Sequence, residues 1–261
     1  KAVVQTHGNL LEQASRYAKA LSFSSSDRLA WLASLSFDAS LMDVFGGLVS
    51  GATIAPIDPR AIDLSRLPAL VAERRLTVLH VTPTVFRTLS RVAAGAAFDS
   101  LRAVVLGGEA VRPEEIAFFD ERFPSHAILY NLYGASEHSF SIGGEVDRGS
   151  RSSEVPIGRP VGDVEILLLD ADGREESIQG EMHLRSRHTA LRYWNSPELS
   201  DRAFRPDASA LSDQTRLIQE ESFQPVVDAG LGWRPAHRFH GTPGSGVGSD
   251  IRFHHPRGRG R

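Results

Sequence analysis

The sequence predicts an α/β fold: a mostly parallel sheet with flanking helices, then a small antiparallel β subdomain and an irregular C-terminal tail. Strand-like and helix-like patterns alternate over residues 1–148, which is typical of βαβ units. A polar segment at 149–153 ends the alternation, and shorter strand patterns follow to residue 204. Residues 205–261 are rich in Gly, Pro, Arg and His and show no sustained period, so no regular structure is predicted there.

The elements of the first part follow from apolar spacing and from capping residues. Asn9 is expected to cap the first helix, Pro83 to open the fourth, and Gly51 to end the second in a left-handed conformation. Helices are predicted over 10–21, 41–49, 67–73, 84–92 and 113–123, and strands over 29–32, 53–55, 78–81, 102–106 and 127–130.

The β subdomain at 149–204 is predicted from two strand patterns joined by a turn. Residues 164–169 form an apolar run, 170–173 carry the turn composition Asp-Ala-Asp-Gly, and 180–185 alternate as a strand does. An antiparallel pair with a tight turn accounts for this order.

Composition excludes several classes of function. The chain has 261 residues, 41% of them hydrophobic, a net charge of -3 and no cysteine. The charge makes no case for nucleic acid, and the lack of cysteine excludes disulfides and thiolate metal sites. No apolar run approaches the ~20 residues of a membrane span, so a cytoplasmic location is expected. The histidines lack metal-ligand spacing, and His183 and His188 are expected to be solvated.

The heptapeptide Asn131–Glu137 is the most informative segment. It follows the apolar run 127–130, and therefore lies where a strand is expected to end in a tight turn. Ligands bind at the carboxyl ends of strands in α/β sheets. A glycine lets the backbone approach a ligand, a hydroxyl can donate to phosphate, and a carboxylate can hold Mg²⁺. The segment predicts a site for a nucleotide phosphate and its metal.

Further motifs occur in a fixed order around the heptapeptide. They are Lys1-Ala2-Val3, Phe37-Asp38-Ala39-Ser40, Gly107-Gly108-Glu109-Ala110, Gly180-Glu181-Met182-His183-Leu184 and Ala190-Leu191-Arg192-Tyr193-Trp194. With the heptapeptide, which has Ala135 and Ser136 where the family has Pro and Thr, they resemble the adenylation domain of nonribosomal peptide synthetases. That domain belongs to the AMP-forming acyl-adenylate superfamily. The likeness runs from residue 1 to about residue 204.

The resemblance implies a role for each matching residue. Asp38 would bind the α-ammonium of a substrate amino acid, Ser136 the α-phosphate, and Glu137 Mg²⁺, so that Ser136 and Glu137 are the catalytic candidates. Lys1 would be a remnant of the phosphate loop. The AMP site would comprise Gly107, Gly108, Glu109, Ala110, Asn131, Tyr133, Gly134 and Ser136. The amino-acid pocket would comprise Asp38, Ala39, Met42, His80, Val105, Gly107, Leu132, Phe140 and Ser141.

The activity implied by the resemblance has two steps. An amino acid reacts with ATP and Mg²⁺ to give aminoacyl-AMP, and the acyl group then passes to the phosphopantetheine thiol of a carrier domain in the same parent chain. Neither nucleic acid nor membrane is an expected partner. The family's phosphate loop is expected to lie upstream of Lys1, and its ribose-binding Asp and catalytic Lys do not appear. We therefore expect this chain alone to be inactive, and the tail to be read out of frame or to follow a deletion.

Other interpretations stay open at this point. Asp38 is also a common type of helix cap, although capping by Asp38 would not explain the flanking motif, and a helix N-terminus favours an ionised carboxylate. The heptapeptide could be an exposed turn, and His80 a core histidine. The parent enzyme could instead activate a fatty acid or an aryl acid, neither of which needs the carboxylate of Asp38. The chain could also be a non-catalytic remnant or a partner-binding protein.

Overall fold

A computed structural model describes residues 2–93, 95, 97–150, 152, 155–170, 172, 174–176, 181–206 and 216–219. The predictions for Lys1, for Gly180 and for most of the tail fall outside these residues. Within the described part, no helix has the length and apolar character needed to cross a membrane.

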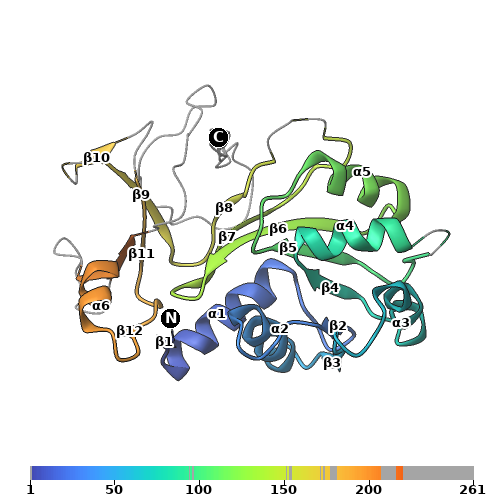
Figure 1. The fold of residues 1–261 in the computed structure, drawn as a ribbon, viewed down its shortest axis with the longest axis horizontal. Coiled ribbons are helices and arrows are strands. Elements are labelled where there is room, and N and C mark those ends of the chain that lie inside the picture. Colours follow the sequence, from blue (N-terminus) through green and yellow to red (C-terminus); the bar gives the residue numbers. More distant parts are fainter. Residues whose placement is uncertain are drawn as a thin grey trace, which may run out of the picture.

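A seven-stranded sheet forms the centre of the molecule, with the strand order β3-β2-β4-β5-β6-β7-β8 (Figure 1). Strands β3, β2, β4, β5 and β6 run parallel to one another, whereas β7 is antiparallel to β6 and β8 is antiparallel to β7. The predicted mostly parallel sheet is thus confirmed. The strands are β2 (Arg28–Trp31), β3 (Thr53–Pro56), β4 (Val78–Val81), β5 (Ala103–Gly107), β6 (Ile128–Ala135), β7 (Ser139–Glu145) and β8 (Arg159–Pro160).

Helices cover both faces of this sheet. Apolar side chains of α3, α4 and α5 pack with one face in a first core cluster, and those of α1 and α2 pack with the other in a second. In Figure 1, α4 and α5 lie on one side of the sheet and α1 and α2 on the other. The helices are α1 (His7–Ala20), α2 (Asp38–Val49), α3 (Leu67–Glu73, preceded by the 3-10 turn Leu64–Arg66), α4 (Pro83–Val92) and α5 (Pro113–Arg122).

Side-chain alternation along the central strands decides which residues meet α1 and α2. Successive residues of a strand point to opposite faces. Leu79 and Leu106 join the α3–α5 cluster, whereas Val78, Val105 and Leu132 join the α1–α2 cluster. The pocket positions predicted on β4, β5 and β6 share the parity of this second group, and therefore face α1 and α2.

A second sheet follows the first and has the strand order β10-β9-β11-β14-β13, all pairs antiparallel. It confirms the predicted small antiparallel part. Two of its strands correct the expectation of an irregular tail, because β13 runs to Pro206 and β14 (Arg216–Gln219) pairs with β11. A strand of four residues is too short to show a period on its own. The strands are β9 (Glu165–Leu169), β10 (Glu175–Glu176), β11 (Glu181–Ser186), β13 (Phe204–Pro206) and β14.

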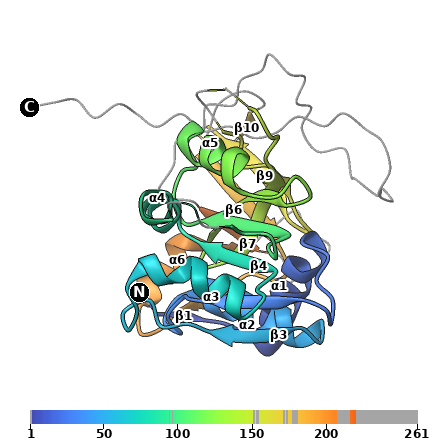
Figure 2. The same ribbon diagram turned by 90° about the vertical axis from the view of Figure 1, so that its right-hand side faces the viewer.

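The first strand of the chain pairs with a strand near residue 192. Strand β1 (Val3–Val4) pairs with β12 (Arg192–Tyr193), which helix α6 (Pro197–Ala203) follows. Figure 2 shows β1 near α6 at the same end of the molecule. This pairing joins segments almost two hundred residues apart in sequence, so local patterns do not predict it.

Capping contacts decide where two of the helices begin and end. Helix α1 is capped by Thr6, whose Oγ1 accepts a hydrogen bond from the backbone N–H of Asn9 at 3.0 Å. The expectation of an Asn9 cap is therefore wrong by three residues, and the Asn9 side chain donates to the carbonyl of Thr189 instead. The Gly51 prediction is confirmed: Gly51 has φ +70°, and backbone bonds from Gly51 and Ala52 close the end of α2 as in a Schellman motif.

Candidate functional site

The heptapeptide forms the end of β6 and the turn of a hairpin. Strand β6 continues to Ala135 and pairs with β7, with a register shift between Tyr133 and Gly134. The expectation that the strand ends at Tyr130 is therefore wrong, because the antiparallel partner β7 extends it. An added Cβ at Gly134 would lie 1.8 Å from the carbonyl oxygen of Ser139. Glycine at this position is required by the close approach of the two strands.

The hairpin turn presents the two candidate catalytic residues. Ser136 is exposed and Glu137 is half-buried. The Glu137 carboxylate accepts a hydrogen bond from the Tyr193 hydroxyl at 2.5 Å, and the Glu137 carbonyl accepts one from the backbone N–H of Ala190 at 2.7 Å. Gln5 donates to the Ser136 carbonyl at 3.1 Å. The turn is thus held by segments far away in sequence.

Tyr193 is a site residue to which the sequence analysis assigns no role. The signal for it is the 190–194 motif, which the resemblance includes without giving a role to the tyrosine. Tyr193 engages Oε1 of Glu137, and the second oxygen is a possible metal ligand. Mg²⁺ in proteins is often held by one or two carboxylates together with substrate phosphates. One half-buried carboxylate beside an exposed hydroxyl fits that donor set.

The predicted amino-acid pocket is contiguous. Met42, Val105, Leu132 and Phe140 belong to the α1–α2 cluster, and Ala39 packs against it. Ser141 lies on β7, is fully buried, and has Oγ 2.7 Å from Nδ1 of His138. The hydroxyl of Ser141 is therefore already engaged.

Asp38 lies at the first position of α2, after the N-cap residue Phe37, and is half-buried. Burial raises the pKa of its carboxyl, while backbone N–H donors and the positive charges of His138 and His80 oppose the rise without cancelling it. The helix N-terminus favours the ionised carboxyl, as expected, but desolvation has the larger effect on its pKa. Ala39, the next residue, packs against the cluster that contains Leu132 and Phe140 of the β6–β7 hairpin.

His80 is buried in a polar pair. Its Nδ1 lies 2.9 Å from Oδ1 of Asp43, which also accepts a hydrogen bond from the Tyr17 hydroxyl at 3.2 Å. Burial tends to lower the pKa of His80, but the charge and hydrogen bond of Asp43 and the charge of Asp38 raise it overall. Asp43 and Tyr17 are not among the site residues predicted from the sequence. A charged residue among the apolar positions of α2 is the signal that could have found Asp43.

The predicted adenine-site residues Gly107 to Ala110 lie at the end of β5 and just after it, and Asn131 and Tyr133 lie on the opposite side of β6 from Leu132. Gly107 is buried, and Gly108 has φ +82°, a conformation that favours glycine. Ala110 is exposed. The Glu109 carboxylate accepts hydrogen bonds from the backbone and hydroxyl of Thr84 at the start of α4. Their contact with adenine stays a prediction.

Asn131 and Tyr133 alternate with Leu132 along β6. Asn131 is buried and donates from Nδ2 to the Pro156 carbonyl at 2.8 Å. Tyr133 is half-buried and packs against the apolar cluster formed by Ile142 and the second sheet. One amide hydrogen of Asn131 thus fixes the segment before β8.

A cavity of about 320 Å³ lies away from all these residues. Residues 125–129 and 145–148 line it, at the start of β6 and the end of β7. Because the hairpin turn lies at the other end of these two strands, the cavity is not part of the candidate site.

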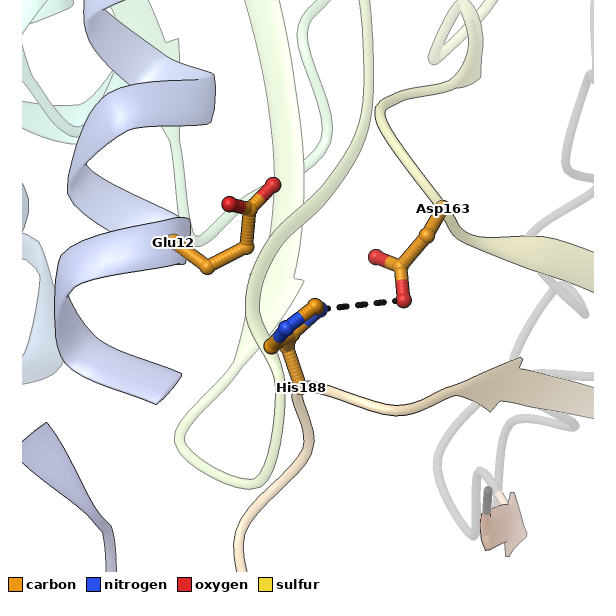
Figure 3. A group of neighbouring side chains, drawn as sticks. All are labelled: Glu12, Asp163 and His188. Atoms are coloured by element: carbon orange, nitrogen blue, oxygen red, sulfur yellow. Dashed lines mark hydrogen bonds and ion pairs between the residues drawn. The ribbon is translucent and has the colours of Figure 1, made fainter. Parts of the chain in front are cut away.

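A second polar cluster connects α1 with the second sheet (Figure 3). Ligand atoms of Glu12, Asp163 and His188 lie within 4.8 Å of one another. Nδ1 of His188 is 3.1 Å from Asp163, and Arg16, whose side chain is 4% exposed, is 3.2 Å from the same carboxylate. The guanidinium of Arg16 already supplies positive charge here, so we interpret the cluster as a structural ion-pair network.

The cluster corrects one expectation about histidines. His188 is half-buried and bonded, and His183 is buried with Nε2 3.5 Å from Glu181. Both were expected to be solvated. Their pairing with acidic residues comes from the packing of β11 and the following loop, which the sequence pattern does not reveal.

Replacing Asp163 by asparagine is expected to lower the free energy of unfolding by about 1–2 kcal/mol. The pKa of Asp163 is held down: burial raises it, but hydrogen bonds from Arg187 and Ser186 and the charges of Arg16 and His188 lower it more. The stabilisation of the fold by ionised Asp163 is partly offset, because burial lowers the pKa of its partner Arg16. Urea unfolding at pH 7 measures the change, with exposed Asp172→Asn as control. If Asp163→Asn is as stable as Asp172→Asn, the interpretation of the cluster as a stabilising ion-pair network is wrong.

The fold and the site together define a class of protein: an α/β protein with candidate ligand-binding residues at the carboxyl edge of a parallel sheet, on a glycine-containing hairpin and a helix start. The chain belongs to the family of AMP-binding enzymes, whose sequence profile matches residues 1–194. It is similar to surfactin synthase subunit 2 of Bacillus subtilis (strain 168), with 32% identity over 185 residues. The match covers 69% of this chain and 5% of that protein.

Solved structures share the fold. The N-terminal subdomain of Klebsiella oxytoca NpsA, in complex with 3-hydroxybenzoyl-AMSN, superposes with a TM-score of 0.74 at 22% identity, over 87% of this chain and 56% of that chain. The nonribosomal peptide synthetase FmoA3 (S1046A) gives 0.78 at 24% identity, over 86% and 25%. The family profile and the match to surfactin synthase subunit 2 confirm the resemblance to nonribosomal peptide synthetase adenylation domains, and the solved structures agree in fold. The chain spans only part of each of these proteins.

Proposed function

We propose that this chain forms the AMP- and amino-acid-binding part of an enzyme that converts an amino acid and ATP into aminoacyl-AMP. The observation that carries the proposal is the packing of the start of α2 against the β6–β7 hairpin, where Ala39, next to Asp38, packs against the cluster that contains Leu132 and Phe140. On this proposal, the carboxylate that takes the substrate ammonium is near a serine and a glutamate suited to phosphate and Mg²⁺. Membership of the AMP-binding family supports this arrangement.

The residues act by binding and by neutralising charge. Attack of a substrate carboxylate on the α-phosphate brings two anions together, so positioning and charge stabilisation matter most. Ser136 donates a hydrogen bond to the phosphate, and Glu137, oriented by Tyr193, holds Mg²⁺. The metal, when bound, neutralises phosphate charge. Asp38 fixes the ammonium end of the amino acid and so aims its carboxylate at the phosphate.

Transfer of the acyl group to a phosphopantetheine thiol on a carrier domain is the second part of the proposal. The chain covers only a small share of surfactin synthase subunit 2, which leaves room in such a parent protein for a carrier domain. That this chain alone does not complete the reaction stays a prediction.

Two ligands test the proposal: a nonhydrolysable aminoacyl-AMP mimic, and the matched acyl-AMP mimic without the amine. Calorimetry is expected to give a Kd below about 10 μM, or -7 kcal/mol, for the amine-bearing mimic. Asp38→Asn is expected to weaken that mimic about 30-fold, since a hydrogen bond to a charged group contributes about 2 kcal/mol. It should leave the mimic without the amine unchanged.

The exposed Asp58→Asn variant is the matched control and should alter neither affinity. Equal losses for both mimics in Asp38→Asn would argue against an ammonium partner at Asp38. Tighter binding of an aryl-acyl mimic than of every aminoacyl mimic would favour an aryl-acid ligase. NpsA motivates that alternative, because it was solved with a 3-hydroxybenzoyl ligand. If none of the mimics binds, the proposed function is wrong.

A further inference from the structure

Three buried polar side chains form a connected chain behind the predicted amino-acid pocket: Tyr17 on α1, Asp43 on α2 and His80 on β4. Tyr17 is fully buried, and Asp43 and His80 are 2% and 8% exposed. Oδ1 of Asp43 lies 2.9 Å from Nδ1 of His80 and 3.2 Å from the Tyr17 hydroxyl. Among the described residues, Oδ2 of Asp43 is buried without a hydrogen-bond partner. The Asp43 carboxyl therefore contacts both His80 and Tyr17 through one oxygen, Oδ1.

The contacts determine the orientation of the imidazole ring. Nδ1 faces Asp43, and Nε2 points toward Gly107, where an added Cβ would lie 3.4 Å from it. Because a carboxylate can only accept, the Nδ1 atom must carry its hydrogen. The Nε2 atom is then the one that gains or loses a proton, and the raised pKa of His80 favours an Nε2–H donor.

The neighbours of Nε2 belong to the pocket. Strand β4 pairs with β5 so that His80 lies opposite Val105, and Gly107 on β5 pairs with Leu132 on β6. The Tyr17 ring lies 5.8 Å from His80 and 5.9 Å from Phe140 between ring centroids. Apart from Asp38 and Ser141, whose hydroxyl is engaged by His138, the predicted pocket positions around His80 are apolar or glycine. One directed donor in such a pocket discriminates strongly between side chains with and without an acceptor.

We propose that Asp43 and Tyr17 are positioning residues that hold His80 as a hydrogen-bond donor, and that the pocket takes an α-amino acid whose side chain ends in a carboxylate or carboxamide oxygen. This inference rests on the proposed function. It goes further because it names a substrate class for this chain and two residues behind the pocket. Asp38 would hold the ammonium end and His80 the far end of the side chain.

Three nonhydrolysable aminoacyl-AMP mimics test the substrate class, carrying glutamate, glutamine and norvaline. Norvaline has the same chain without the terminal oxygens. The 261-residue chain is expected to bind the glutamate or the glutamine mimic at least 10-fold more tightly than the norvaline mimic, which corresponds to 1.4 kcal/mol. The better of the two distinguishes carboxylate from carboxamide.

Asp43→Asn and Tyr17→Phe test the positioning roles. Asp43→Asn is expected to reduce the preference to less than about 3-fold, with the norvaline affinity changed less than 2-fold. Tyr17→Phe keeps the ring and should give a smaller reduction. A direct readout in the free protein is the pKa of His80 by nuclear magnetic resonance, which should fall in Asp43→Asn.

Each outcome decides between the two proposals. Norvaline bound as tightly as glutamate and glutamine would overturn the substrate class while leaving the proposed function intact. An unchanged His80 pKa in Asp43→Asn would overturn the positioning role, whatever the ligand affinities. Failure of all three mimics to bind would overturn the proposed function, and this inference with it.

Discussion

Replacing Gly134 by alanine is expected to lower the free energy of unfolding by about 3 kcal/mol and to abolish binding of AMP mimics. The added Cβ would lie 1.8 Å from the Ser139 carbonyl oxygen and 2.6 Å from its carbon. Both are backbone atoms, so no side-chain rotation relieves the clash. The strands of the hairpin must separate, and Ser136 and Glu137 move with the turn.

Gly8→Ala is the matched control for this change. Gly8 lies in the first turn of α1, where an added Cβ would have its nearest contact at 3.7 Å. Alanine there is expected to be neutral or stabilising by up to about 1 kcal/mol. Urea unfolding and calorimetry on both variants measure the contrast. A Gly134→Ala protein as stable as Gly8→Ala would show that the hairpin is not packed as described.

Replacing Asp27 by alanine is expected to lower the free energy of unfolding by about 3 kcal/mol at pH 7. Asp27 is 2% exposed and lies just before β2. Its carboxylate accepts hydrogen bonds from Arg102 at 2.6 and 2.9 Å, from Thr77 at 2.8 Å and from the backbone of Ser24 at 2.8 Å. The substitution removes the hydrogen bonds that join the segments before β2, β4 and β5. It also leaves Arg102 without its carboxylate partner.

The effect of Asp27 has a defined pH dependence. Burial raises the pKa of Asp27, but the hydrogen bonds from Arg102, Thr77 and Ser24 lower it overall. A carboxyl with a depressed folded-state pKa stabilises the fold above its unfolded pKa of about 3.9, and loses that contribution as the pH falls through the folded value. The stability difference between wild type and Asp27→Ala should therefore be constant from pH 7 to pH 5 and shrink below pH 4.

Urea unfolding at several pH values checks this dependence. The exposed Asp58, whose nearest cation is Arg60 two residues away, supplies the control Asp58→Ala, which should change stability little. A difference between wild type and Asp27→Ala that grows on acidification would contradict the assigned direction of the Asp27 pKa.

Features encoded within a dozen neighbouring residues could be predicted from the sequence. The alternation of helix and strand, the Gly51 end of α2 and the Pro83 start of α4 all follow from local spacing and backbone chemistry. The two-residue period separates the residues of each strand into two faces. The pairing of β4, β5 and β6 is what puts His80, Val105 and Leu132 on the same face.

Features that join distant segments could not be predicted in this way. The β7 strand that extends β6 beyond Tyr130, the Tyr193–Glu137 hydrogen bond and the Asp43–His80 pair all depend on how elements pack. The pKa of Asp38 also depends on packing. It rises because neighbouring segments bury the carboxyl, although its position at the start of a helix would lower it.

The amino-acid sequence thus suffices for the α/β class, the order of its elements and the family motifs, because each is written in adjacent residues. Packing is needed to learn which groups the motifs meet. The glutamate of the hairpin meets a tyrosine of β12, and the histidine of the pocket meets an aspartate on a helix. Hydrogen bonds and desolvation act over a few ångströms in space, and distance along the chain does not record that proximity.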